Sequence, residues 1–258
     1  MQQKSYVPLF LGVVFTLSTL GYTNATANAA EDTSSDLVTA LANSGRPEED
    51  RARDAGRKPA QVLALLGIKS GMTVLDLIAA GGYYTEVLSV AVGPTGTVYT
   101  QNPKAVLEFR DGANDKALTA RLADNRLANV KRLDREIADM GIAPGSLDAV
   151  ITALNFHDVH NRGGTEAVAG MLAALSAALK PGGVLGVIDH AGNPDADNAK
   201  LHRIHEDLVV KAVTDAGFVV EAKSDVLRNP DDTHTLPVFD PAMRGKTDRF
   251  VLRLRKPE

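Results

Sequence analysis

The chain has 258 residues, of which 44% are hydrophobic and 23% charged, so it has the composition of an ordinary globular protein with one large domain or two small ones. The formal net charge of −4 gives no general attraction to nucleic acids or to anionic membranes. Aromatic residues make up 5% and tryptophan is absent, which argues against the stacking surfaces of single-strand nucleic-acid binders. We therefore expect a small-molecule substrate and no nucleic-acid partner, and the oligomeric state stays open.

The first residues have the pattern of a cleaved secretory signal peptide. Lys4 precedes an apolar stretch over 7–20, and Ala27-Asn28-Ala29 is a small-residue cleavage site. The apolar stretch is too short to serve as a stable membrane anchor. The chain contains no cysteine, so it has no disulfide and no lipidated N-terminal cysteine. We predict a signal peptide over 1–29, a flexible segment over 30–46, one domain over 47–258, and a periplasmic or secreted location.

The domain is predicted to begin with helices and then a strand, a turn and a helix. Pro47 and three acidic residues start a helix that Pro59 splits, and Gly67 ends its second half. Residues 74–78 form a buried strand, residues 79–82 form a small-residue turn, and a helix starts at Tyr83. This is the usual first unit of a nucleotide-binding α/β domain, because small residues allow close approach to a ligand at the helix start.

Strands and helices alternate along the rest of the chain. The apolar patterns predict strands over 97–100, 129–133, 147–154, 184–189, 218–222 and 249–255, and helices over 104–110, 115–128, 166–179 and 200–216. Residues 180–183 read as a sharp turn. Such alternation predicts an α/β fold with a mostly parallel sheet and helices on both faces.

Several segments resemble the class I S-adenosylmethionine-dependent methyltransferases. The segments are VLDLIAAGG at 74–82, SLDAVITALNFHD at 146–158, LKPGGVLGVID at 179–189, and AGFVV followed by RFVLRLRK at the end of the chain. More narrowly, FHDVHN, IDHAG, LHRIHED and RGKTDRFVL are similar to an exported branch of predicted methyltransferases.

The resemblance implies a Rossmann-like seven-stranded sheet with an antiparallel last strand and a cofactor across the carboxyl ends of strands one to four. It implies S-adenosylmethionine as cofactor and methyl transfer to an unknown small or medium-sized substrate. Matched to the family's motifs, the cofactor-binding residues are Asp76, Ala80, Gly81, Gly82, Gln101 and Asp134.

Three positions depart from the family's pattern. Ile78 and Ala80 stand where the first motif has glycines, and Gln101 stands where an acid takes the ribose hydroxyls. An amide accepts with one oxygen and without charge, so affinity for the cofactor should fall by roughly 1–2 kcal/mol. The strand and turn over 74–82 are therefore better evidence for the fold than for binding of the cofactor.

Histidines follow the fourth and fifth predicted strands, where substrates of such folds lie. His157, Asp158 and His190 are the candidate catalytic residues, with an imidazole as general base and Asp158 or Asp189 orienting it. His202 and His205 are expected on one face of a helix. Two other interpretations stay open: surface and capping histidines, or a divalent metal site of His and Asp, although no HExxH pattern occurs and we assign no metal ligands.

The alternative to a methyltransferase is an exported protein that keeps the fold without catalysis and binds a metal or another ligand. A serine hydrolase has little support because no G-x-S-x-G motif occurs. The long Pro-rich loop over 228–247 is either a lid, with Arg244 and Lys246 closing on an anionic substrate, or a solvated loop with local ion pairs.

Overall fold

The computed structural model describes Met1, residues 35–42 and residues 44–258. The predicted signal peptide over 1–29 therefore lies outside the described residues, apart from Met1. Within the segment predicted to be flexible, residues 35–42 form a helix whose Leu41 is 3% exposed. This side chain joins one of the two hydrophobic clusters of the domain.

Seven strands form one sheet in the order β3-β2-β1-β4-β5-β7-β6. In chain order they are β1 (Thr73–Leu77), β2 (Thr97–Gln101), β3 (Val130–Leu133), β4 (Leu147–Ala153), β5 (Leu179–His190), β6 (Val219–Ser224) and β7 (Arg249–Arg255). β7 runs antiparallel to both β5 and β6, and the remaining pairs are parallel. The predicted Rossmann-like, mostly parallel sheet of seven strands is confirmed.

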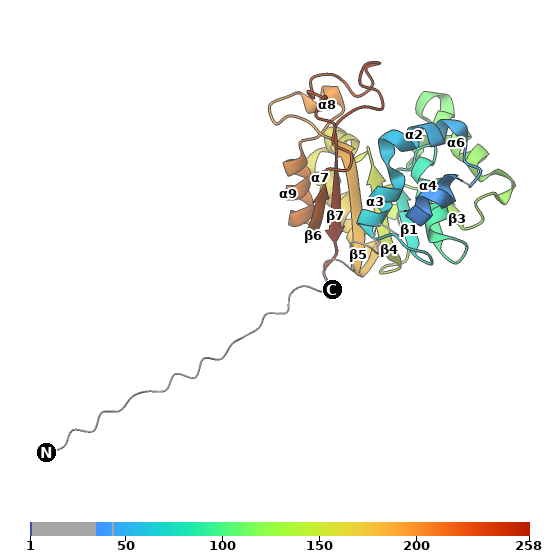
Figure 1. Cartoon of the computed structure of the whole chain (residues 1–258), viewed down its shortest axis with the longest axis horizontal. Coiled ribbons are helices and arrows are strands. Elements are labelled where there is room, and N and C mark those ends of the chain that lie inside the picture. Colours follow the sequence, from blue (N-terminus) through green and yellow to red (C-terminus); the bar gives the residue numbers. More distant parts are fainter. Residues whose placement is uncertain (2–34, 43) are drawn as a thin grey trace.

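Helices cover both faces of the sheet (Figure 1). α3 (Pro59–Leu66) and α4 (Tyr83–Val92) pack on one face, against apolar side chains such as Val74 and Ile151. α7 (Phe156–Ala178) and α9 (Glu206–Asp215) pack on the other face, against Leu75 and Val150. Adjacent residues of a strand thus enter different clusters, as the two-residue period of a strand requires.

Further helices lie around the carboxyl ends of the parallel strands (Figure 1). They are α2 (Glu48–Arg57), α5 (Lys104–Leu107), α6 (Phe109–Leu122) and α8 (Asn198–Leu201), with 3₁₀ turns over Ile137–Asp139 and Ala123–Asn125. α6 is tied to α2 and α4 by ion pairs of Arg121 with Asp50, at 2.6 Å, and with the fully buried Glu86. Arg126 also pairs with Glu86, so this buried carboxylate has two cations around it.

The prediction of one helix over 200–216 is wrong. The chain forms α8 and α9 with an interruption between them, in which Arg203 and Ile204 are 0% and 1% exposed. Ile204 pairs with Ala191 in a parallel bridge and donates its N–H to the carbonyl of His190 at 3.0 Å. Pairing with the end of β5 takes the backbone out of helical geometry, so His202 and His205 do not share a helix face.

Two further boundaries differ from the sequence-based predictions. Residues 180–183, expected as a turn, belong to the long strand β5. α7 begins at Phe156 rather than near residue 166, and it bends at Gly164, where φ is 63° and ψ is −161°. The early start matters because it places His157 and Asp158 in the first helical turn after β4.

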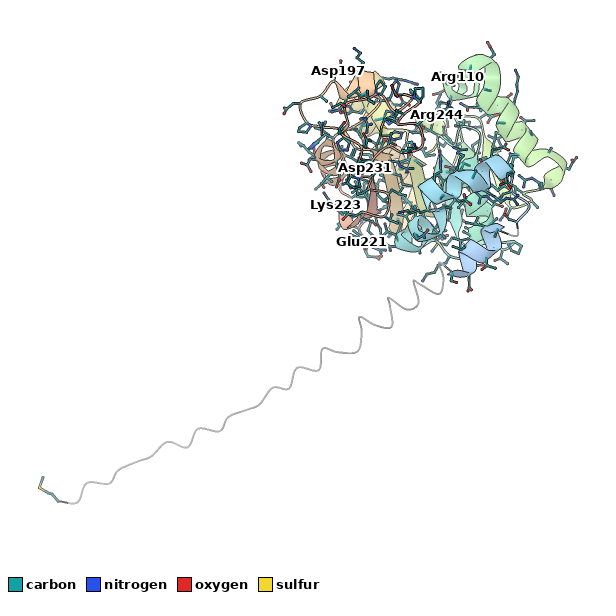
Figure 2. All side chains as sticks on the ribbon, turned by 45° about the horizontal axis from the view of Figure 1, so that its top comes forward. Arg110, Asp197, Glu221, Lys223, Asp231 and Arg244 are labelled. Atoms are coloured by element: carbon teal, nitrogen blue, oxygen red, sulfur yellow. The ribbon has the colours of Figure 1, made fainter. Side chains whose placement is uncertain are left out.

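The outer strand β6 carries charged side chains along the free edge of the sheet (Figure 2). Glu221 pairs with Arg253 and Arg255 on β7, and Lys223 pairs with Glu206 at 2.9 Å. Charges on an edge strand discourage pairing with another chain. Among the described residues, no helix is long and apolar enough to cross a membrane.

Candidate functional site

Asp189 joins the ends of β4 and β5 into one cluster. Its carboxylate is fully buried and accepts hydrogen bonds from the ring Nδ1 and the backbone N–H of His157, both at 2.7 Å. It also accepts the backbone N–H of His190 at 2.7 Å. The bond to Nδ1 fixes the tautomer of His157, so that the neutral ring presents the lone pair of Nε2. Of the two acids expected to orient a histidine, Asp189 is the one in contact with His157 Nδ1.

The two histidines of this cluster have opposite pKa shifts. Burial lowers the pKa of His157, but the negative charge and hydrogen bond of Asp189 outweigh it, so the pKa lies above its ordinary value. Burial lowers the pKa of His190 well below its ordinary value, and the positive charges of His157 and Arg249 add to this effect. His190 is therefore neutral at pH 7, with its Nδ1 2.8 Å from the hydroxyl of Thr247.

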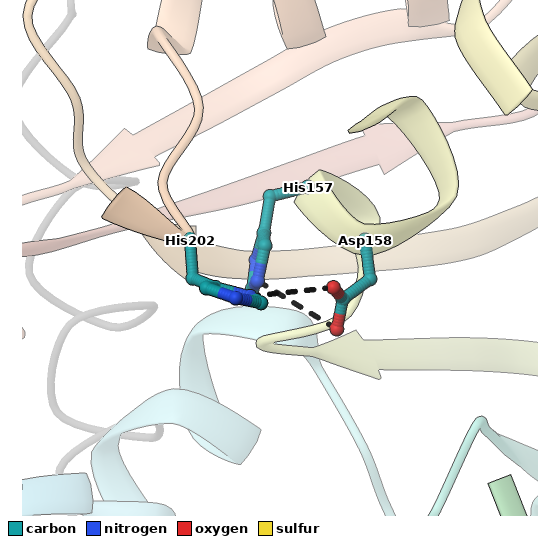
Figure 3. Close-up of side chains that lie close together, drawn as sticks. All are labelled: His157, Asp158 and His202. Atoms are coloured by element: carbon teal, nitrogen blue, oxygen red, sulfur yellow. Dashed lines mark ion pairs between the residues drawn. The ribbon is translucent and has the colours of Figure 1, made fainter. Parts of the chain in front are cut away.

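Asp158 belongs to the same cluster, and the rings of both His157 and His202 approach its carboxylate from one side (Figure 3). Its carboxylate oxygens are 3.7 Å from Nε2 of His157 and 3.5 Å from Nδ1 of His202. The His157 ring lies 5.8 Å from the rings of both His190 and His202, measured between centroids. The structure thus brings the three predicted catalytic residues together and adds His202.

The small-residue loop after β1 has the left-handed backbone that the family's glycines suit. Ile78 has φ of 54° and Ala80 has φ of 50°, although a side chain at such φ costs about 1–2 kcal/mol. Neighbouring amides hold this loop in place: Asn102 Oδ1 accepts from the N–H of Ala80 at 2.8 Å, and Asn155 Nδ2 donates to the carbonyl of Ile78 at 3.0 Å. Ile78 and Ala80 therefore keep the turn of the motif without its glycines.

Gln101 is at the end of β2, as predicted, but its side chain faces the protein. The amide is fully buried, with Oε1 accepting from the N–H of Ile78 at 3.1 Å and Nε2 donating to the carbonyl of Arg135 at 2.6 Å. Both ends of the amide are used, so Gln101 offers no acceptor pair to a ribose. In this geometry it supports the loop rather than a ligand.

Asp76 lies beneath the loop, at 3% exposure within β1. Its carboxylate accepts from the hydroxyl of Thr85 at 2.6 Å, which joins β1 to α4. Burial raises the pKa of Asp76 to about 7, against an ordinary value of 3.8. Asp76, the acid of the first motif, thus links β1 to α4 by a hydrogen bond.

The remaining predicted cofactor residues differ in their surroundings. Gly82 has φ of 85° at the N-cap of α4, and a Cβ there would lie 2.9 Å from a methyl group of Leu118, so a side chain at this position would be strained and would displace Leu118. Gly81 packs against Ala117, which lies in α6 next to Leu118. Asp134 follows β3, where its half-exposed carboxylate accepts from Arg132 Nε at 2.8 and 2.9 Å.

Arg57, at the end of α2, places a positive charge near this loop. Its guanidinium lies 4.4 Å from the ring centroid of Tyr83, at the start of α4, and no carboxylate among the described residues forms an ion pair with it. Burial and the charges of Arg53 and Arg249 lower the pKa of Arg57. An anionic group would relieve this crowding of positive charge next to a helix N-terminus.

Three histidines lie apart from the cluster. Nδ1 of His160 lies 3.4 Å from Oδ1 of Asn161, and His205 is the N-cap residue of α9. His234 bridges Asn193 and Asp248, each at 3.0 Å. These three fit the interpretation of capping and surface histidines.

The loop over 228–247 is held both by a buried ion pair and by local pairs, such as Arg228 with Asp248 at 3.3 Å. Asp232 and Arg203 are 5% and 0% exposed and form two hydrogen bonds of 2.8 and 3.0 Å. At the end of the loop, the hydroxyl of Thr247 lies 2.8 Å from Nδ1 of His190. Sequence patterns did not reveal Thr247 or Asn102 as parts of the site, because a lone Thr or Asn after a turn has no distinctive spacing.

No family model and no curated protein matches the sequence. Solved structures do: a SAM-dependent methyltransferase from Aquifex aeolicus has a TM-score of 0.58 at 24% identity, covering 77% of this chain and 89% of that chain. The fold is that of the class I methyltransferases. CrArsM, an arsenic(III) S-adenosylmethionine methyltransferase from Chlamydomonas reinhardtii, has a TM-score of 0.55 at 18% identity, covering 86% and 73% of the two chains.

The same fold also occurs in the [4+2]-cyclase SpnF, with a TM-score of 0.57 at 17% identity and coverage of 79% and 81%. At these identities the likeness concerns the fold. Because one fold carries different reactions, the activity of this chain has to be argued from its own residues.

Proposed function

We propose that this protein transfers a methyl group from S-adenosylmethionine to a small or medium-sized acceptor held at the cluster of His157, Asp158 and His190. The observation that carries the proposal is the buried His157–Asp189 pair at the carboxyl edge of a class I methyltransferase sheet. In open α/β sheets, ligands bind at this edge.

The residues of the candidate site suit the amino-acid part of S-adenosylmethionine better than they suit its ribose. Arg57 and the N-terminus of α4 suit the carboxylate of its amino-acid part, because both offer positive charge without an acidic partner among the described residues. At the ribose, Gln101 is already bonded on both sides. We therefore expect residue 101 to contribute nothing to the binding of the ribose.

The protein residues have a limited task in such a reaction. When bound, S-adenosylmethionine supplies an electrophilic methyl group, so the protein has to align the acceptor and take its proton. His157 Nε2 offers a lone pair, and Asp189 stabilises the imidazolium that results. His190, neutral at pH 7, can hold the acceptor by a hydrogen bond without adding charge.

Calorimetric titration of the mature protein with S-adenosylmethionine and S-adenosylhomocysteine tests the cofactor. We expect binding that is weakened about tenfold or more by Arg57→Met, since a charged hydrogen bond contributes about 1.5–3 kcal/mol. Arg51→Met, on the exposed side of α2, is the matched control. Absence of heat at millimolar ligand would refute the proposal.

The second candidate is a protein that keeps the fold and binds a ligand without methyl transfer. The internal hydrogen bonds of Gln101 favour it, because they leave the ribose without its usual partner. Methyl transfer from radiolabelled cofactor to a panel of small acceptors separates the two. Transfer that is lost in Asp189→Asn supports catalysis, whereas cofactor binding without transfer to any acceptor supports the second candidate.

We also propose that the protein is exported, as a member of an exported branch of methyltransferases. The charged Lys4, the apolar stretch over 7–20 and Ala27-Asn28-Ala29 support this. Because S-adenosylmethionine is made in the cytosol, the proposal requires a supply of cofactor after export. Mass spectrometry of the protein from fractionated cells should give a chain that starts near Ala30, and an intact N-terminus in the cytosolic fraction would contradict it.

A further inference from the structure

We infer that His157, Asp158 and His202 form a three-ligand site for a divalent transition metal ion, best suited to Zn²⁺. The three residues come from two segments that β4 and β5 bring together: the first turn of α7 and the residue after α8 (Figure 3). One possible ligand atom from each residue lies within 4.8 Å of those of the other two.

The spacing of these atoms suits an ion better than it suits direct contact. The carboxylate oxygens of Asp158 are 3.7 Å from His157 Nε2 and 3.5 Å from His202 Nδ1, at or beyond the limit of a hydrogen bond. Zn²⁺ with bonds of about 2.0–2.1 Å holds tetrahedral ligands about 3.3 Å apart. The two separations to Asp158 are close to this value, and no pair of the three candidate ligand atoms has to close from more than 4.8 Å.

One of the ligand atoms is left without any partner. Nδ1 of His202 is shielded from solvent and makes no hydrogen bond among the described residues. A buried polar atom without a partner costs free energy, and such atoms call for an explanation. A metal ion between His202 and Asp158 would provide the missing partner.

The contacts of His157 and His202 are those expected of metal-binding histidines. Asp189 accepts the Nδ1–H of His157 at 2.7 Å and so directs Nε2 towards Asp158, which is the carboxylate–histidine–metal arrangement. The His202 ring rests against Phe239, with centroids 4.9 Å apart, which limits its rotation. Arg162 is 3.6 Å from Asp158, but its side chain is 67% exposed and free to move away.

The ligand types narrow the choice of ion. Two imidazole nitrogens and one carboxylate oxygen suit Zn²⁺ and other first-row divalent ions rather than Mg²⁺ or Ca²⁺, which prefer oxygen. Three protein ligands leave at least one position open to water or an acceptor. Asp158 and His202 have side chains 30% and 38% exposed, so an ion can enter from solvent.

The inference concerns ion binding and does not rest on methyl transfer. Proton acceptance and ion binding use the same lone pair of His157 Nε2, so only one of them can operate at a time. The experiment is therefore carried out without S-adenosylmethionine, so that its result is separate from that of the cofactor titration.

The test is calorimetric titration of EDTA-treated, untagged mature protein with Zn²⁺, together with the absorption spectrum after addition of Co²⁺. We expect one ion per chain, and an affinity that falls more than about tenfold in His202→Ala and in Asp158→Asn. His205→Ala and His160→Ala are matched controls and should bind as the native chain does. Circular dichroism checks that each variant is folded.

Two results would overturn the inference. One is the absence of stoichiometric binding in titrations that reach about 100 µM Zn²⁺. The other is binding that persists in both His202→Ala and Asp158→Asn, or is lost in the His205 and His160 controls, since exposed histidines would then hold the ion. Both variants keep Asp189 and His157, so a folding failure of the buried pair does not obscure the outcome.

Discussion

Replacing Asp76 by asparagine should make the free energy of unfolding depend much less on pH. The carboxylate is 3% exposed and its pKa is raised to about 7 by burial, whereas in the unfolded chain it returns to about 3.8. Between these values the folded protein keeps a proton that the unfolded chain has released. Stability is therefore lost as the pH rises from about 4 to 7, and it changes no further above pH 7.

The size of the effect follows from the two pKa values. Each pH unit in that range changes the free energy of unfolding by about 1.4 kcal/mol, so the span from pH 5 to pH 7 is worth about 3 kcal/mol. Asparagine does not titrate, and its carbonyl can still accept from Thr85, whose hydroxyl lies 2.6 Å from the present carboxylate. The variant should gain about 3 kcal/mol relative to the native chain between pH 5 and pH 8.

Urea unfolding of both proteins at pH 5 and pH 8 measures this difference. The other titrating groups cancel when the variant is compared with the native chain at each pH. Asp139→Asn is the control, since its side chain is 86% exposed. A difference between Asp76→Asn and the native chain that is the same at both pH values would refute the raised pKa.

Two further predictions concern buried polar groups. Gln101→Glu should destabilise the protein by about 2 kcal/mol and should not tighten cofactor binding, because the new carboxylate would face the carbonyl of Arg135. Urea unfolding measures the stability and calorimetry the cofactor binding, with Gln61→Glu on the exposed face of α3 as the control. Tighter binding without loss of stability would show that residue 101 reaches the ribose. Arg203→Met should lower the free energy of unfolding by about 3–5 kcal/mol, because it leaves Asp232 charged and buried. In urea unfolding, the double variant Arg203→Met with Asp232→Leu should recover much of this stability. Equal losses of stability in the single and double variants would contradict the role of the ion pair.

Much of the fold could be predicted because the apolar patterns and turn residues are local signals. The strand over 147–154, the split at Pro59 and the last strand over 249–255 all agree with the structure. The helix predicted over 200–216 is wrong because Arg203 and Ile204 are buried by contacts outside their own segment: Ile204 pairs with Ala191, and Arg203 pairs with Asp232. Tertiary pairing there overrides a helical pattern.

The site was predictable in its position but less so in its contacts. His157, Asp158 and His190 do come together, because the carboxyl ends of β4 and β5 are neighbours. The partner of Gln101 could not be foreseen, since it is a backbone carbonyl 34 residues further along the chain. Nor could His202, which reaches the cluster only because a residue expected in a helix has a left-handed backbone, with φ of 53°.

The place of β7 between β5 and β6 has a consequence for the order of synthesis. The strand that completes the sheet is the last one made, and Thr247, just before it, is the residue that contacts His190. A nascent chain that stops short of residue 247 leaves β5 with an open edge and His190 without its hydroxyl partner. The contact between His190 and Thr247 can therefore form only after this last strand of the sheet has left the ribosome, whereas the contacts among His157, Asp158, Asp189 and His202 involve earlier residues alone. A chain halted at that stage would carry an exposed edge, which is a known route to aggregation.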